Sequence, residues 1–211
     1  MADELIFYTS PMSRGRIVRW MLEEVGVPYH TELLDFASTM KADAYRAINP
    51  MGKVPAIVHE GEVVTEVAAI CAYLADAFPI ARLAPPLGRV RAAYYRWLFF
   101  AAGPLEAATT NAALGVVPPS EREVMVGYGT MARALDAIET AVAGRPFVAG
   151  DAFSAADVYV GSQLGWGMAF GPIEQRPAFT AYVDSLRARP AAIRARQIDD
   201  ALLPPEHRGR M

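Results

Sequence analysis

The stretch "NPMGKVPAIVHEGEVVTEVAAI", residues 49–70, decides the fold of the first part of the chain. Its apolar run begins at Pro55 and is interrupted by Glu60 and Gly61, a pair suited to a tight turn. We therefore predict a β-hairpin whose turn lies at these two residues. The apolar stretch that follows, residues 67–78, predicts a helix.

The residues before this stretch alternate between the two periodicities. "LIFYT" at 5–9 is typical of a strand, and 14–26 has apolar residues at helical spacing with Gly26 as a stop signal. Residues 29–35 alternate like a second strand. The order β-α-β, a connecting segment and then β-β-α predicts a small mixed sheet covered by helices over residues 1–78.

A change of character follows at residues 79–88, "PIARLAPPLG", where prolines break both periodicities and predict a linker. Beyond it the apolar spacing is helical, and an all-α bundle is expected over residues 89–211. Helices are predicted at 89–114, 120–143, 154–170 and 175–188, with a short one at 190–199.

Composition narrows the functional classes. The chain has 211 residues, 53% of them apolar, and a net charge of −3 with scattered basic residues, which disfavours nucleic acid as a partner. The acidic N-terminus and the lack of a long apolar run predict a cytoplasmic protein without a membrane span. Three histidines lie far apart, so no metal is expected. The single cysteine, Cys71, is interpreted as a buried, inert thiol.

Two features of residues 49–70 indicate a binding site. Pro55 at the start of a strand would leave the backbone of Val54 at a sheet edge, where an extended peptide can add by strand pairing. Glu66 stands where the hairpin ends and a helix begins, so its carboxylate could meet an amine while backbone N–H groups meet a carboxylate. The simpler alternatives are an ordinary edge strand and a first-turn acid.

A third feature is the loop "YTSPMSRGR", residues 8–16, between the first strand and the first helix. The hydroxyls of Ser10 and Ser13 lie where free N–H groups converge, a place that stabilises a thiolate or another anion. The alternative for both serines is helix capping.

Together these features resemble the glutathione transferase family. The resemblance covers nearly the whole chain and includes "GRPFVAGDAFSAADVYV", residues 144–160, in which Ser154 and Asp157 form a capping box. It implies an α/β thioredoxin-like N-terminal domain followed by an all-α helical-bundle C-terminal domain.

The resemblance also implies which residues hold glutathione, through Lys53, Val54, a cis Pro55, Glu66 and Val67. Family members commonly have serine at the position of Val67, and the loss of one hydrogen bond is expected to weaken binding.

For the family's reaction, a hydrogen-bond donor must stabilise the glutathione thiolate. Ser13 is the first candidate and Ser10 the second, with Arg14 adding positive charge.

The implied activity joins the glutathione thiolate to a small hydrophobic electrophile, or reduces an organic hydroperoxide, in a detoxifying homodimer without a further cofactor. Tyr95, Phe99 and Trp166 are candidates for the co-substrate pocket. Two alternatives stay open: a non-catalytic ligand-binding or protein-interaction module of the same fold, and a glutathione-dependent isomerase.

Overall fold

The computed structural model describes residues 5–203, which divide into two compact units. Unit 1 comprises the described residues up to 83 together with those from 190 onward, and unit 2 comprises residues 84–189. Within this described part, no helix is long and apolar enough to cross a membrane.

Unit 1 is built on a four-stranded mixed sheet of order β2-β1-β3-β4. The strands are β1 (Leu5–Thr9), β2 (His30–Leu33), β3 (Ala56–His59) and β4 (Glu62–Thr65). β1 is parallel to β2, whereas the pairs β1–β3 and β3–β4 are antiparallel. Glu60 and Gly61 both have positive φ, 52° and 86°, which confirms the predicted hairpin turn.

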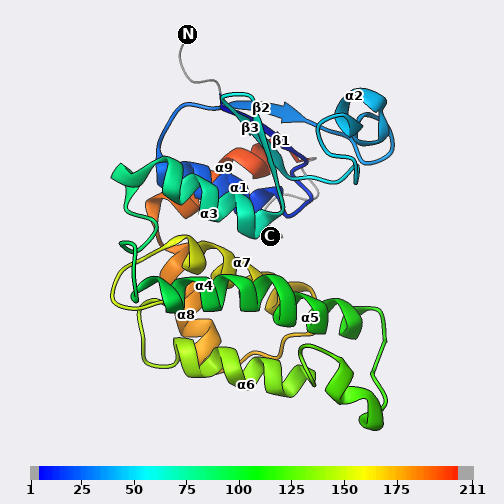
Figure 1. The fold of residues 1–211 in the computed structure, drawn as a ribbon, viewed down its shortest axis with the longest axis vertical. Helices are drawn as coiled ribbons and strands as arrows, with labels where there is room; N and C mark the ends of the chain where they lie inside the picture. Colours follow the sequence, from blue (N-terminus) through cyan, green and yellow to red (C-terminus); the bar gives the residue numbers. More distant parts are fainter. Residues whose placement is uncertain (1–4, 204–211) are drawn as a thin grey trace. The chain divides into compact units, whose positions relative to one another are not determined.

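Two helices of unit 1 lie against the sheet, α1 (Gly15–Val25) and α3 (Val67–Ala77) (Figure 1). Their apolar faces meet the sheet in a core that includes Phe7, Met21, Leu22, Ile57, Ile70 and Leu74, all fully buried. The connection from β2 to β3 contains a 3₁₀ turn at Thr39–Lys41 and the short α2 (Asp43–Arg46), and a further 3₁₀ turn at Pro79–Ala81 follows α3.

The last helix, α9 (Pro190–Ala201), packs along α1 and so belongs to unit 1. Ala191 and Ala195 are buried, and their small side chains allow a close approach of the helices. Three ion pairs also join the two helices, Arg16–Asp200, Arg19–Asp199 and Arg194–Glu23. The predicted helical domain of residues 89–211 therefore differs from the observed division, because its last helix finds its partners in the first unit.

Unit 2 is a helical bundle. Its helices are α4 (Arg91–Phe100), α5 (Glu106–Ala113), α6 (Met131–Val142), α7 (Ala155–Phe170) and α8 (Pro177–Arg187). α4 continues into α5 through a π-helical turn, Ala101–Leu105, which contains Pro104. Proline has no N–H to complete the regular helical ladder, so the predicted helix 89–114 is interrupted by a wider turn.

The predicted helix 120–143 is wrong over its first part. Residues Ser120–Met125 form a 3₁₀ turn, and α6 begins only at Met131. Two glycines, Gly127 and Gly129, separate the segments, and Gly129 has a positive φ of 63° that ends the turn. Thr130 then caps α6, its hydroxyl accepting from the Arg133 N–H at 3.2 Å.

The predicted capping box at the start of α7 is confirmed. Asp157 accepts from the N–H of Ser154 at 2.8 Å, and the Ser154 side chain is paired with the first turn of the helix. The same carboxylate also accepts from the Val148 N–H at 2.7 Å and from the Tyr182 hydroxyl at 2.8 Å. It thereby joins the preceding loop, α7 and α8.

Candidate functional site

Strand register brings the three predicted site features to one end of the sheet. Tyr8 of β1 lies opposite Ala56 of β3, which in turn lies opposite Thr65 of β4. The chain therefore leaves β1 toward Ser10, enters β3 from Val54 and leaves β4 toward Glu66 at the same end. Residues up to 56 positions apart in sequence thus converge on one rim of unit 1.

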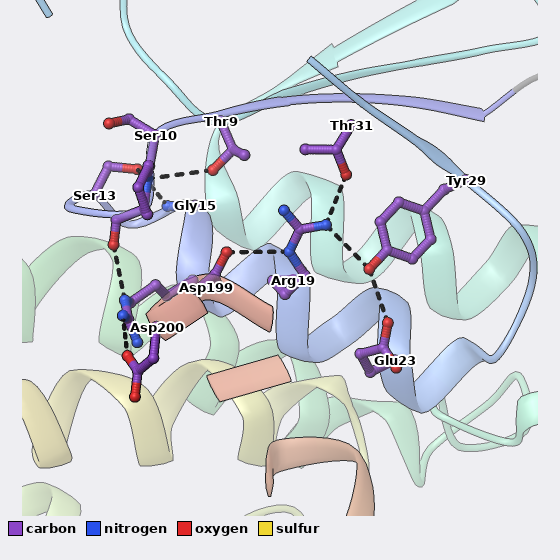
Figure 2. A network of polar contacts seen from close by, with 12 residues as sticks. Thr9, Ser10, Ser13, Gly15, Arg19, Glu23, Tyr29, Thr31, Asp199 and Asp200 are labelled. Atoms are coloured by element: carbon purple, nitrogen blue, oxygen red, sulfur yellow. Dashed lines mark hydrogen bonds and ion pairs between the residues drawn. The ribbon is translucent and has the colours of Figure 1, made fainter. Parts of the chain in front are cut away.

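The loop after β1 is held by local hydrogen bonds. The Ser13 hydroxyl donates to the Ser10 carbonyl at 2.6 Å and accepts from the Gly15 N–H at 2.9 Å. Thr9 adds a longer bond to the same carbonyl, at 3.4 Å (Figure 2). The proton of Ser13 is therefore directed into the loop, as the capping alternative predicts.

Ser10 differs from Ser13 in this respect. Among the residues that the structure describes, no hydrogen bond uses the Ser10 hydroxyl, although the residue is largely buried. Its proton can be directed toward a ligand. Arg14, the third residue predicted here, is exposed at the start of α1.

The Val54–Pro55 peptide bond is cis, as expected from the resemblance. The expectation that Pro55 opens an edge strand is wrong, because β3 lies between β1 and β4. The accessible backbone is instead that of Val54, which precedes the strand. No hydrogen bond inside the described part of the chain uses its N–H or carbonyl, and its side chain packs on the cluster of Met40, Tyr45 and Ala56.

Two side chains fix the residue before Val54. The Tyr45 hydroxyl and the Asn49 amide both donate to the Lys53 carbonyl, at 2.6 and 2.8 Å. Asn49 also accepts from the Met51 N–H at 3.1 Å and so shapes the turn before the cis bond. Burial raises the pKa of Tyr45 to about 12, so its hydroxyl remains a donor over the whole physiological range. The Lys53 side chain itself is exposed.

Glu66 holds an unusual backbone conformation, with φ 65° and ψ 119°, at the start of α3. A residue other than glycine rarely adopts a positive φ, and such a backbone conformation costs about 1–3 kcal/mol. Within residues 5–203 no side chain caps α3, and the Ile70 N–H makes the first bond, to the Glu66 carbonyl. The N–H groups of the first turn, including that of buried Val67, therefore remain available to an anion beside the exposed Glu66 carboxylate.

The three predicted pocket residues all belong to unit 2. Tyr95 and Phe99 lie one turn apart on α4 and are exposed, with ring centroids 6.4 Å apart. Trp166 lies on α7, edge-on to Phe170. None of the three lines the apolar cavity of about 130 Å³ next to α5, whose walls include Ala108, Val116, Tyr128 and Met131.

Sequence reasoning missed several residues that hold the site. Tyr45 donates to the Lys53 carbonyl, and Arg16 donates to the Pro11 carbonyl. Neither residue carries a local signal of this role, because these carbonyls come within reach only in the folded loops. Asn49 could have been found, since asparagine two residues before a turn amide is typical of an Asx turn.

Arg19, also missed, is 2% exposed and makes three hydrogen bonds through its Nε and Nη1 atoms. It donates to Asp199 at 3.2 Å, to Thr31 at 2.7 Å and to Tyr29 at 3.1 Å (Figure 2). Its guanidinium also lies over the ring of Phe7. A charge this deeply buried needs such partners. We assign it to the support of α1 and α9 rather than to ligand binding.

Cys71 is fully buried on α3, and burial raises the pKa of its thiol from 9.0 to about 12. A protonated, inaccessible thiol is unreactive, which agrees with its predicted inert role. Over residues 5–203, no three His, Cys, Asp or Glu side chains group together in a way that could hold a metal ion.

The fold and the rim together define a class: a thioredoxin-like unit with a cis proline before its third strand, followed by a helical unit. The family profile described as "Glutathione S-transferase, N-terminal domain" matches residues 9–77, and the one described as "Glutathione S-transferase, C-terminal domain" matches residues 120–185. The two matches together span more than half of the chain.

Individual relatives support the same family assignment. Glutathione S-transferase GST-4.5 of Xanthomonas campestris is 29% identical over 170 residues, 75% of this chain and 80% of that protein. The glutathione transferase structure from Methylococcus capsulatus is 30% identical with a TM-score of 0.77, covering 94% of this chain and all of that one. A sphingomonad glutathione S-transferase in complex with glutathione is 30% identical with a TM-score of 0.74, covering 92% and 98%. The chain belongs to the glutathione S-transferase family.

Proposed function

We propose that this protein binds glutathione on the rim of unit 1 and joins its thiolate to a small hydrophobic electrophile. The observation that carries this proposal is the convergence of Ser10, Val54 and Glu66 at one end of the sheet. A peptide with an amine, a carboxylate and a thiol finds a partner there for each group. The glutathione bound to the sphingomonad relative supports the assignment.

The proposed placement of glutathione follows from the free groups of the rim. Its cysteinyl backbone pairs with the N–H and carbonyl of Val54. Its γ-glutamyl carboxylate meets the N–H groups at the start of α3, and its amine meets the Glu66 carboxylate. The exposed Lys53 is available to the glycyl carboxylate. Because Val67 lacks a hydroxyl, the carboxylate has one hydrogen bond fewer than a serine would provide.

The sulfur donor is proposed to be Ser10 rather than Ser13. A hydroxyl that donates to the glutathione sulfur favours the thiolate and lowers the thiol pKa. The thiol proton goes to solvent, the thiolate forms a carbon–sulfur bond to the electrophile, and the leaving group departs with its electron pair. Ser13 is already engaged in the loop, so its role is to shape the path on which Ser10 lies.

Several finer assignments remain predictions. Tyr95, Phe99 and Trp166 are proposed to contribute to the co-substrate pocket, and the exposed rings of the first two are suited to an apolar partner. A homodimer in the cytoplasm, a role in detoxification, activity on hydroperoxides and independence of metals or other cofactors are further expectations.

The test combines binding and turnover. Isothermal titration of the protein with glutathione should give binding in the micromolar to low millimolar range, which Glu66→Ala weakens by at least tenfold. With glutathione and an aryl halide, Ser10→Ala should lose most of its turnover at nearly unchanged glutathione affinity. Full activity of Ser10→Ala would rule out the assigned sulfur donor.

The absence of Ser at position 67 favours one second candidate, a non-catalytic module of the same fold. It predicts no measurable glutathione binding by the wild-type chain. In that case Val67→Ser would be the first variant to examine for restored binding.

A further inference from the structure

A guanidinium bridges the loop after β1 and the C-terminal helix. Arg16 Nε donates to the Pro11 carbonyl at 2.8 Å, and Arg16 Nη2 donates to Asp200 Oδ1 at 2.5 Å. Asp200 is 184 residues away in sequence, on α9. Both side chains are largely buried, at 9% and 20% exposed, which limits screening by water. Figure 2 shows Asp200 on the same side of the network as Ser10 and Ser13.

This bridge holds the part of the loop that has least support. The Ser10 carbonyl is held by Ser13, and the Arg16 N–H returns to the Ser13 carbonyl at 3.2 Å. Pro11 has no N–H, so its carbonyl is its only backbone hydrogen-bonding group, and Met12 is 48% exposed. Among the described residues, the bond from Arg16 is the one that the structure gives to the Pro11 carbonyl.

We propose that Arg16 and Asp200 are positioning residues for the reaction, through which α9 holds Ser10 at the glutathione sulfur. This inference rests on the proposed function. The Pro11 carbonyl belongs to the peptide that joins Pro11 to Met12, and the proline ring fixes φ of Pro11. A shift of this carbonyl therefore moves the ring and, with it, the Ser10–Pro11 peptide. A hydroxyl hydrogen bond weakens steeply with distance and angle, and a small displacement is therefore enough to reduce thiolate stabilisation.

The simpler interpretation is that the pair only fastens α9 to α1. The chain offers a matched control for that role, because Arg194 on α9 binds the Glu23 carboxylate at 3.1 Å and the Glu23 carbonyl at 3.2 Å. This pair joins the same two helices and has no bond to the loop. Arg194→Gln thus reports the cost of weakening the helix contact alone.

A direct electrostatic effect of these two charges on the thiolate can be distinguished from a positioning effect on Ser10. The two effects predict different signs for the change in the thiol pKa of bound glutathione. Acting only through its charge, Arg16 would stabilise a thiolate and Asp200 would destabilise it. Arg16→Gln would then raise the pKa of bound glutathione, and Asp200→Asn would lower it. If the two residues act by positioning Ser10, both substitutions raise that pKa.

The experiment measures two quantities in Arg16→Gln, Asp200→Asn and Arg194→Gln. The first is amide hydrogen exchange of residues 12–16 without glutathione, and the second is the thiol pKa of bound glutathione from the ultraviolet absorbance of the thiolate. We expect exchange to accelerate by about tenfold and the thiol pKa to rise by about one unit in the first two variants. Arg194→Gln should change neither, and its melting temperature reports the cost of weakening the contact between the two helices alone.

The outcomes separate this inference from the proposed function. A lowered thiol pKa in Asp200→Asn, or equal effects of Arg16→Gln and Arg194→Gln, would overturn the positioning role. If the wild-type protein binds no glutathione, the proposed function fails, and unchanged exchange in Asp200→Asn would then overturn the loop support as well. Asp200→Asn is nearly isosteric and keeps an acceptor for Arg16, so it serves where Arg16→Gln does not fold.

Discussion

Replacement of Asp157 by alanine should be among the most destabilising single changes in unit 2. The carboxylate is completely buried and accepts four hydrogen bonds. Oδ1 receives the Val148 N–H and the Tyr182 hydroxyl, and Oδ2 receives the N–H and the hydroxyl of Ser154. The residue therefore connects the loop before α7 with α8 as well as capping α7.

The magnitude follows from the donors that the change leaves unpaired. Val148 and Ser154 are 1% and 2% exposed, so water cannot readily replace the lost acceptor for their N–H groups. Each buried unpaired N–H costs about 1–3 kcal/mol, and the hydroxyls can rotate to other partners. We expect Asp157→Ala to lower the free energy of unfolding by about 4 kcal/mol. Asp157→Asn should lower the free energy of unfolding by about 3 kcal/mol, because the NH₂ group of asparagine would face hydrogen-bond donors.

Urea unfolding, followed by the circular dichroism of the helices, measures this loss. Asp184→Asn on the exposed face of α8 is the control and should change the free energy of unfolding by less than about 0.5 kcal/mol. A loss below about 1 kcal/mol in Asp157→Ala would refute the reasoning, since it would mean that the buried donors had found other acceptors.

Three further predictions concern the rim, the loop and the buried thiol. Val67→Ser should tighten glutathione binding by about tenfold in isothermal titration, since it adds a hydrogen bond to a charged group. The control Val63→Ser, at an exposed position on β4, should have no effect. An unchanged affinity in Val67→Ser would contradict the proposed placement of the γ-glutamyl carboxylate. Gly15→Ala should lower the free energy of unfolding by about 2 kcal/mol and weaken glutathione binding, because its Cβ would overlap Thr9 Oγ1 and lie 2.9 Å from Ser13 Oγ. The control is Gly103→Ala, whose Cβ meets open space. Equal melting temperatures of the two variants would count against tight packing around Gly15. Because burial raises the pKa of Cys71 from 9.0 to about 12, the native state keeps a proton that the unfolded state releases, and this contribution to stability is complete below about pH 9 and is lost as the pH rises toward 12. The free energy of unfolding of Cys71→Ala, measured in urea between about pH 9 and pH 11, should therefore fall less steeply than that of wild type by up to about 1.4 kcal/mol per pH unit, and identical slopes would mean that the thiol is not protected.

Local features of the chain were sufficient to predict most elements of the fold. β1 and the hairpin turn at Glu60 and Gly61 lie where the apolar pattern and the turn residues place them. The capping box of α7 was also predictable, because Ser154 and Asp157 are neighbours on one helical turn. The predicted helix 120–143 failed where Gly127 and Gly129 interrupt it, since apolar spacing alone does not register a backbone with positive φ.

The candidate site, like the fold, was predictable from the sequence only in part. The types of residue that could meet glutathione, Ser10, Val54 and Glu66 among them, were recognisable from local motifs and from the family resemblance. Which serine has a free proton was not, because Ser13 is engaged by the carbonyl of Ser10 and the N–H of Gly15 only in the folded loop.

The sequence by itself thus determined most of the secondary structure, the family and the candidate groups of the rim, because each depends largely on residues close together in the chain. Only the tertiary structure decided that β3 is an inner strand, that α9 packs on α1, and that Asp200 reaches Arg16 across 184 residues. These arrangements depend on register, helix contact and buried charge pairing. All three arise between segments that are distant in sequence, and no local pattern records them.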